Sequence, residues 1–142
     1  MINENFKVTG EVTIQKNGKV IREIPNTIVT AGKNNIAALI TDAGNKMTHM
    51  AVGTGTTSVA ANNTALVTET DRNALSVAGG APSNNTIVHT AVWAAGDGTG
   101  ALTEAGLFSA SSGGTMMART VFSAVNKAAG DILTITWTVT IS

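Results

Sequence analysis

The stretch DILTITWTVTIS, residues 131–142, decides the fold. Apolar residues alternate with threonines from residue 133 onward, and this period of two predicts a β-strand. The apolar positions that define the alternation are Leu133, Ile135, Trp137, Val139 and Ile141, and the positions between them are Thr134, Thr136, Thr138 and Thr140. We therefore expect one face of this strand to lie in a core and the other to be covered by hydroxyl groups.

The N-terminal segment predicts a β-hairpin over residues 6–24. FKVTGEVTI (6–14) alternates in polarity, and KVIREI (19–24) follows the pair Asn17-Gly18. Both residues of this pair tolerate the positive φ of a type I′ turn, which makes the pair a strong hairpin signal. The hairpin is expected to be either an ordinary part of the domain or an interaction arm that pairs with the sheet edge of a neighbouring subunit.

One short helix is predicted near residues 33–43. Thr30 is a candidate N-cap and Gly44 a candidate end. Its apolar face is formed by Ile36, Leu39 and Ile40. The helix is therefore expected to lie on a surface and to cover one end of a core.

The remainder of the chain predicts further strands separated by turn signals, at 47–53, 71–78, 86–94, 101–108 and 115–122. With the hairpin and the last strand they make about eight, which indicates an all-β fold, an antiparallel β-sandwich of jelly-roll type. No linker divides residues 1–142, so a single domain is expected.

Composition limits the classes of partner. The chain has 142 residues, a formal net charge of +0 and only 13% charged residues. No basic field is available for nucleic-acid phosphates, so no nucleic-acid partner is expected. The N-terminus lacks the pattern of a signal peptide, and no apolar run approaches the roughly 18 residues of a membrane span, so no membrane partner is expected either.

Catalytic and cofactor sites are not predicted. The glycine-rich stretches GTGTT (53–57) and GDGTG (96–100) lack the lysine and following helix of a phosphate-binding loop and are interpreted as turns. His49 and His89 are interpreted as ordinary strand histidines, because no third metal ligand lies at strand spacing. We expect no enzymatic activity, no cofactor and no small-molecule substrate. Ion binding by Asp97 or Asp131, each in a glycine-containing turn, stays open.

Glu104 and Arg119 form one predicted polar pair. If 109–114 is a loop, Phe108 pairs with Thr115 and places the two charges directly opposite each other. Opposed cross-strand charges contribute roughly 0.2–1 kcal/mol. The pair is therefore expected to fix the strand register, with a role in a subunit contact as the alternative.

Several of these segments resemble small virion proteins of tailed bacteriophages. The likeness runs over about residues 26–142 and excludes the N-terminal hairpin. It is carried by an AVGTG strand within 48–69, by LTEAGLF and MMARTVF within 96–122, by 126–140 and by NTIVTAGKNNIAALI (26–40). A weaker likeness extends to the attachment domains of phage tail fibres. The shared motif consists of strands and turns, so it implies no functional residues.

The resemblance implies a non-enzymatic virion protein. A neutral chain with no room for a fibre shaft favours a capsid decoration (cement) protein, whose expected partners are the major capsid protein and copies of itself in a dimer or trimer. The alternatives are a tail, baseplate or tail-fibre attachment protein and a carbohydrate- or receptor-binding module. The hydroxyl row Thr134, Thr136, Thr138 and Thr140 is the predicted interface, with a solvent-facing row as the alternative.

Overall fold

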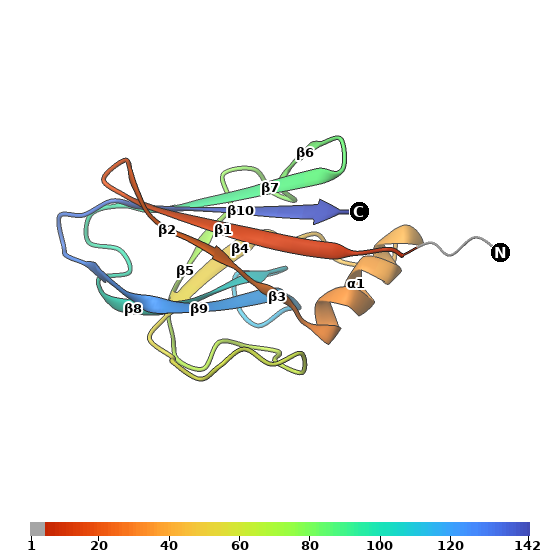
Figure 1. Ribbon diagram of the computed structural model, residues 1–142, viewed down its shortest axis with the longest axis horizontal. Helices are drawn as coiled ribbons and strands as arrows, with labels where there is room; N and C mark the ends of the chain where they lie inside the picture. The colour runs from red at the N-terminus through yellow and green to blue at the C-terminus, as the bar shows by residue number, and fades with distance from the viewer. Residues whose placement is uncertain (1–4) are drawn as a thin grey trace.

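A computed structural model describes residues 5–142 and shows two stacked β-sheets with one helix at the end of the sandwich (Figure 1). The elements in chain order are β1 (Val8–Lys16), β2 (Lys19–Pro25), β3 (Thr27–Ile28), α1 (Thr30–Ile40), β4 (His49–Gly53), β5 (Glu69–Ala74), β6 (Ala81–Ser83), β7 (Thr86–Trp93), β8 (Gly100–Phe108), β9 (Met116–Lys127) and β10 (Leu133–Ile141). The predicted antiparallel β-sandwich with a single short helix is confirmed.

The first sheet, sheet A, has the strand order β2-β1-β10-β7-β6, and the second, sheet B, has the order β3-β9-β8-β4-β5. All of the strand pairs are antiparallel. The first and last strands, β1 and β10, pair within sheet A. Four hairpins, β1–β2, β4–β5, β6–β7 and β8–β9, each keep two consecutive strands in one sheet. The jelly-roll type of the sandwich stays a prediction. The short strands β3 and β6 are additions to the predicted set.

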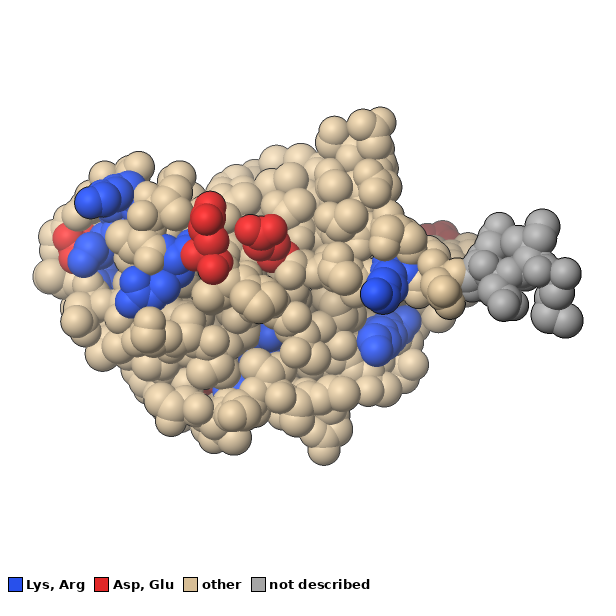
Figure 2. All heavy atoms as spheres, viewed as in Figure 1, with Lys and Arg blue, Asp and Glu red and all other residues tan. Residues whose placement is uncertain are grey.

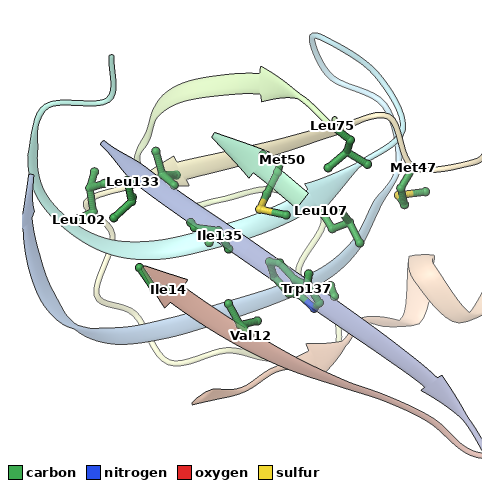
Figure 3. Packing of buried hydrophobic residues seen from close by; sticks show 14 of the residues in the cluster. Val12, Ile14, Met47, Met50, Leu75, Leu102, Leu107, Leu133, Ile135 and Trp137 are labelled. Carbon is green, nitrogen blue, oxygen red and sulfur yellow. The ribbon is translucent and has the colours of Figure 1, made fainter. Parts of the chain in front are cut away.

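The core lies between the sheets (Figure 3). Val12 and Ile14 from β1 and Ile135 and Trp137 from β10 point toward sheet B, and all four are fully buried. Met50 of β4 faces them from the other sheet. The prediction for residues 131–142 is therefore confirmed: one face of this strand lies in the core. Trp93 of β7 is also fully buried.

The N-terminal hairpin forms as predicted, with Asn17 at φ 53° and Gly18 at φ 80° in the turn. Its first strand lies inside sheet A, between β2 and β10, and contributes Val12 and Ile14 to the core. The hairpin is therefore an ordinary part of the sandwich and not a separable arm. Only its outer strand, β2, is free for the contact with another subunit that the sequence suggested.

The helix differs from its prediction in position and in orientation. It spans Thr30–Ile40 instead of 33–43; Val29 occupies the N-cap without a side-chain cap, and the chain turns away at Asp42, at φ 58°, before Gly44. Gly32 packs against β9, where a Cβ would overlap the Met117 carbonyl oxygen. This close approach turns the Gly32 side of the helix inward and leaves Ile40 83% exposed.

Candidate functional site

The two sheets differ in what covers their outer faces. The segment 54–68 crosses the outer face of sheet B and closes a small second core (Figure 1). The outer face of sheet A carries no such cover from the described residues. Two surfaces on sheet A and α1 are therefore available for contact: the threonine face and the helix groove, each defined by its residues below.

The threonine face is the outer surface of β1, β10 and β7. Strand register places its side chains in cross-strand rows: Thr9, Thr140 and Thr86 form one row, and Thr13, Thr136 and Thr90 form another. Thr138 lies between Glu11 and Val88, and Thr134 lies between Gln15 and Val92. The complete set of threonines is Thr9, Thr13, Thr86, Thr90, Thr134, Thr136, Thr138 and Thr140. The predicted row of four is thus the centre of a two-dimensional array.

Few charges lie on this array. Glu11 is the charged residue that alternates with the threonines on this face of β1, whereas Lys16, at the end of β1, alternates to the other face and donates to the Asn126 carbonyl. Glu23 of β2 lies beside Thr13. Figure 2 shows Lys and Arg side chains gathered toward the two ends of the molecule, with acidic side chains on the otherwise mostly uncharged surface between them. A face that is rich in hydroxyl groups and poor in charge can meet another surface through direct and water-mediated hydrogen bonds without desolvating ions.

The helix groove lies where α1 meets the open end of the sandwich. A hollow of about 460 Å³ and a second of about 400 Å³ share Phe6, Val8, Ile36 and Ile40. The other lining residues are mostly apolar: Asn35, Leu39, Asn45, Lys46, Met47, Gly79, Ile87, His89, Met117, Val139 and Ile141 in the first, and Lys33 and Ala37 in the second. Phe6 is 69% exposed, so the groove has an apolar rim as well as an apolar floor.

His89 borders the groove from β7. Its side chain is 3% exposed, and its Nδ1 atom has no hydrogen-bond partner among the described residues. Burial lowers the pKa of His89, against a smaller opposing effect of a hydrogen bond with the Trp137 backbone. The ring is therefore neutral at pH 7 and contributes no charge to the groove.

The predicted pair of Glu104 and Arg119 is present, but its setting differs from the prediction. Arg119 Nη2 lies 2.9 Å from Glu104 Oε2, and both side chains are fully buried. Phe108 pairs with Met116, so the connection between β8 and β9 is one residue longer than the predicted loop, and a register shift between Leu107 and Phe108 then places Glu104 opposite Val121. The predicted register, with Thr115 opposite Phe108 and the charges directly opposed, is therefore wrong. Both the assumed loop length and the assumed ladder without bulges failed.

This ion pair holds the segment 54–68 on sheet B. Glu104 Oε1 accepts hydrogen bonds from the backbone N–H groups of Gly55 (2.9 Å) and Thr68 (2.7 Å), and Oε2 accepts one from Val67 (3.0 Å). Arg119 donates to Asn63 Oδ1 (3.1 Å) and to the Thr57 carbonyl (3.0 Å). Both ends of the segment are thus fixed by one buried pair.

The electrostatics of Glu104 follow from these contacts. Burial by itself raises the pKa of the carboxyl, but the hydrogen bonds from Thr68, Val67, Arg119 and Gly55 together outweigh burial and lower the pKa below its ordinary value. Glu104 is therefore ionised at pH 7 and pairs with the Arg119 cation. The sequence offered no signal that this pair would be buried, since its partners are backbone groups of a distant loop.

The remaining candidates are structural. Gly55 of GTGTT is buried, and its backbone N–H donates to Glu104. Gly96 and Gly98 of GDGTG have positive φ in the turn before β8, and Gly100 has positive φ at the first position of β8. Asp131 accepts a hydrogen bond from Asn17 (2.9 Å), and its pKa is lowered by this bond and by a second one from the Ala128 backbone. Over residues 5–142, no group of three or more His, Cys, Asp or Glu side chains is placed to hold a metal ion. Asp97 therefore belongs to no such group.

None of the helical structure within 5–142 is long and apolar enough to span a membrane. Comparison of the chain with protein-family models, with curated proteins and with solved structures finds no match. Functional inference therefore depends on the surfaces described above and on the motifs in the sequence.

Proposed function

We propose that this chain is a non-enzymatic structural protein of a tailed-phage virion, and specifically a decoration protein that binds the head shell and copies of itself. The observation that carries the proposal is the threonine face, an uncovered and nearly uncharged sheet surface on a rigid sandwich. A decoration protein repeats one modest contact over many symmetric copies, and avidity makes the whole attachment strong.

The position of the phage-like motifs in the fold supports this division of roles. LTEAGLF supplies Glu104, MMARTVF supplies Arg119, and the AVGTG segment supplies Gly53 and Gly55, which pack against the Glu104 carboxylate. The residues that carry the resemblance thus meet in one buried cluster. They form the scaffold, and the contact with a partner is left to exposed surfaces such as the threonine face.

Co-sedimentation with head shells that lack the protein tests the assignment. We expect Thr136→Arg to abolish sedimentation with the shells, because an added cation on the central row must be desolvated at the contact. Thr64→Arg, in the exposed segment on the sheet B side, is the matched control and should sediment like the unaltered protein.

Three results would redirect the proposal. Equal sedimentation of the two variants would remove the threonine face from the contact. Binding to tails instead of heads would move the assignment to the tail, baseplate or fibre alternative. Binding to neither, together with capture on a glycan surface, would favour the carbohydrate-binding alternative.

A further inference from the structure

The turn at Asn17-Gly18 is joined to a second connection of the sandwich through the asparagine. At the end of the sandwich that lies away from α1, this β1–β2 turn contacts the connection between β9 and β10 (Figure 1). The backbone N–H of Asn17 donates to the Ile132 carbonyl (2.9 Å), and its side-chain Oδ1 accepts from the Ile132 N–H (2.9 Å). Its Nδ2 group donates to Asp131 Oδ1 (2.9 Å). Both ends of the Asn17 amide are therefore held by the neighbouring connection.

Asp131 is itself positioned to hold the amide. Its second carboxylate oxygen, Oδ2, accepts a hydrogen bond from the Ala128 backbone N–H (2.9 Å). The bond from Asn17 and, to a smaller extent, the bond from Ala128 lower the pKa of Asp131, so the carboxyl is ionised at pH 7. The acceptor that faces the Asn17 amide is thus a fixed carboxylate.

The pair Asn17-Gly18 also carries a chemical reaction of its own. In an Asn-Gly pair the glycine nitrogen can attack the asparagine Cγ atom, because glycine has no side chain to obstruct the approach. The new N–Cγ bond closes a five-membered succinimide ring, the Cγ–Nδ2 bond breaks, and ammonia leaves with the proton of the glycine nitrogen. Water then opens the ring and gives aspartate or isoaspartate. Both residues of the pair are exposed, so water has access to them.

The fold opposes the first step of this reaction. The Asn17 side chain must turn toward the Gly18 nitrogen before the ring can close, and both hydrogen bonds of its amide must break for this to happen. Ring closure therefore requires the β1–β2 turn to separate locally from the β9–β10 connection. Such local openings are frequent at exposed turns compared with global unfolding.

The product does not restore the original contact. An aspartate at position 17 has no Nδ2 donor, and one of its oxygens would lie against the Asp131 carboxylate where the 2.9 Å hydrogen bond now is. Two carboxylates at this spacing repel each other. Lys16 and Lys127 supply positive charge nearby, but their Nζ atoms donate to backbone carbonyls elsewhere. An isoaspartate in addition lengthens the backbone of the turn by one carbon atom.

We propose that Asn17-Gly18 is a modification site, at which spontaneous deamidation converts the contact between the β1–β2 turn and the β9–β10 connection from a closed to an open form. While the contact is closed, Asp131 and Ile132 hold the amide away from Gly18, so the reaction proceeds in molecules whose contact has opened. Loss of ammonia makes the conversion one-way. This inference does not depend on the virion assignment, because it uses only the turn and its partners.

Deamidation of the full chain, measured by peptide mapping and mass spectrometry, tests the protection. We expect Asn17 to be modified about tenfold more slowly or less in the folded protein than in guanidinium chloride at the same pH, because two side-chain hydrogen bonds must break first. Asp131→Ala removes one of these bonds and should raise the rate in the folded protein about two- to tenfold. Asp97→Ala is the matched control and should leave the rate unchanged, since Asp97 ends the same Ala-Ala-Gly-Asp sequence in another turn.

A second asparagine provides a comparison within the same molecule. Asn84 is the first residue of the two-residue β6–β7 connection, at φ 52°, and Asn17 holds the same place in its own turn at φ 53°. Within residues 5–142, the side-chain hydrogen bonds of the β6–β7 turn come from Asn85 and Thr86 instead of Asn84. In the variant Asn85→Gly both asparagines precede glycine, and we expect Asn84 to deamidate about tenfold faster than Asn17.

A charge exchange tests the effect of the modification on the contact. Asn17→Asp imitates the aspartate product, and the Ile132 amide should exchange its hydrogen about fivefold faster in this variant because of the facing carboxylates. Combining Asn17→Asp with Asp131→Asn places the amide and the carboxylate on opposite sides of the same contact. This double variant should recover most of the protection, which loss of an ordinary structural side chain would not allow.

Three results would overturn the proposal. Equal rates of Asn17 deamidation in the folded and unfolded chain would show that the contact does not protect the site. Equal rates in Asp131→Ala and Asp97→Ala, or in Asn17 and Asn84 of Asn85→Gly, would show that the hydrogen bonds of the Asn17 amide do not control the reaction. Unchanged exchange at Ile132 in Asn17→Asp, or no recovery in the double variant, would show that the modification does not open the contact through charge.

Discussion

Replacement of Glu104 by Gln should be strongly destabilising even though the two side chains have the same shape. All five groups that contact the Glu104 carboxylate are donors: three backbone N–H groups and two nitrogens of Arg119. An amide has one oxygen and one NH₂ group. Whichever way the amide is turned, its NH₂ faces at least two of these donors, and Arg119 is left as a buried cation without a counter-ion.

The magnitude follows from the burial of the pair. Both side chains are fully buried, and removing one charge of such a pair costs about 3–5 kcal/mol. For a domain of this size, that corresponds to a fall in melting temperature of about 6–20 °C. Urea unfolding followed by tryptophan fluorescence measures the change, since Trp93 and Trp137 are both fully buried in the folded state.

Glu69→Gln is the control, because Glu69 forms an ion pair with Arg72 at 2.7 Å, but its side chain is 34% exposed. We expect a loss below about 1 kcal/mol for this variant. If Glu104→Gln also loses less than about 1 kcal/mol, the buried pair does not hold the 54–68 segment and the reasoning is refuted. Hydrogen exchange provides a local check, since the amides of Gly55, Val67 and Thr68 should exchange faster in Glu104→Gln.

Three other perturbations test separate parts of the fold. The free energy of unfolding, measured by urea unfolding at a series of pH values, should decrease on acidification in two windows. Because the pKa of His89 is lowered in the folded state, the unfolded chain binds its proton first, and stability falls as pH drops below about 6.5. The pKa of Glu104 is also lowered in the folded state, so its contribution is complete above its unfolded pKa near 4.5 and is lost as pH falls through the folded value. A stability that is constant from pH 7 to 3 would contradict both assignments. Gly32→Ala should destabilise the fold by about 1–3 kcal/mol, because the added methyl group meets the Met117 carbonyl. The control Ala37→Gly, on the exposed side of α1, should cost about 1 kcal/mol through helix propensity alone. Thermal melts compare the stabilities of the two variants. Deletion of residues 1–24 should give an unfolded product by circular dichroism, since β1 contributes Val12 and Ile14 to the core; a folded product would restore the hairpin as a separable arm.

Sequence patterns predicted the parts of the fold that depend on local periodicity. The alternation in 131–142 and the Asn17-Gly18 turn each specify a strand face or a hairpin by themselves, and both formed as expected. The helix failed where a tertiary contact decided the outcome: the approach of Gly32 to Met117 set which side faces inward, and the apolar Ile40 was left exposed. Hydrophobic periodicity alone cannot predict that contact.

The candidate functional surfaces were likewise predictable only where they depend on local sequence. The four threonines of β10, Thr134 to Thr140, could be found from the sequence of one strand. The threonines beside them could not be found in this way, because the order of the strands in the sheet is determined only by the fold. These are Thr9 and Thr13 of β1 and Thr86 and Thr90 of β7. The Glu104–Arg119 pair was identified from an assumed hairpin, yet its burial depends on a loop almost 50 positions away in the chain, at Gly55. The helix groove had no sequence signal, since it combines residues from α1, β7 and β10.

Imaging of reconstituted particles tests the central claim most directly. Purified protein is added to phage particles that lack it, and the particles are then reconstructed by electron cryomicroscopy. The account predicts ordered density at symmetric positions on the head shell, as dimers or trimers, with the threonine face of sheet A turned toward the shell or toward a neighbouring copy. Density confined to the tail would contradict the decoration assignment, and particles without added density would contradict the virion proposal as a whole.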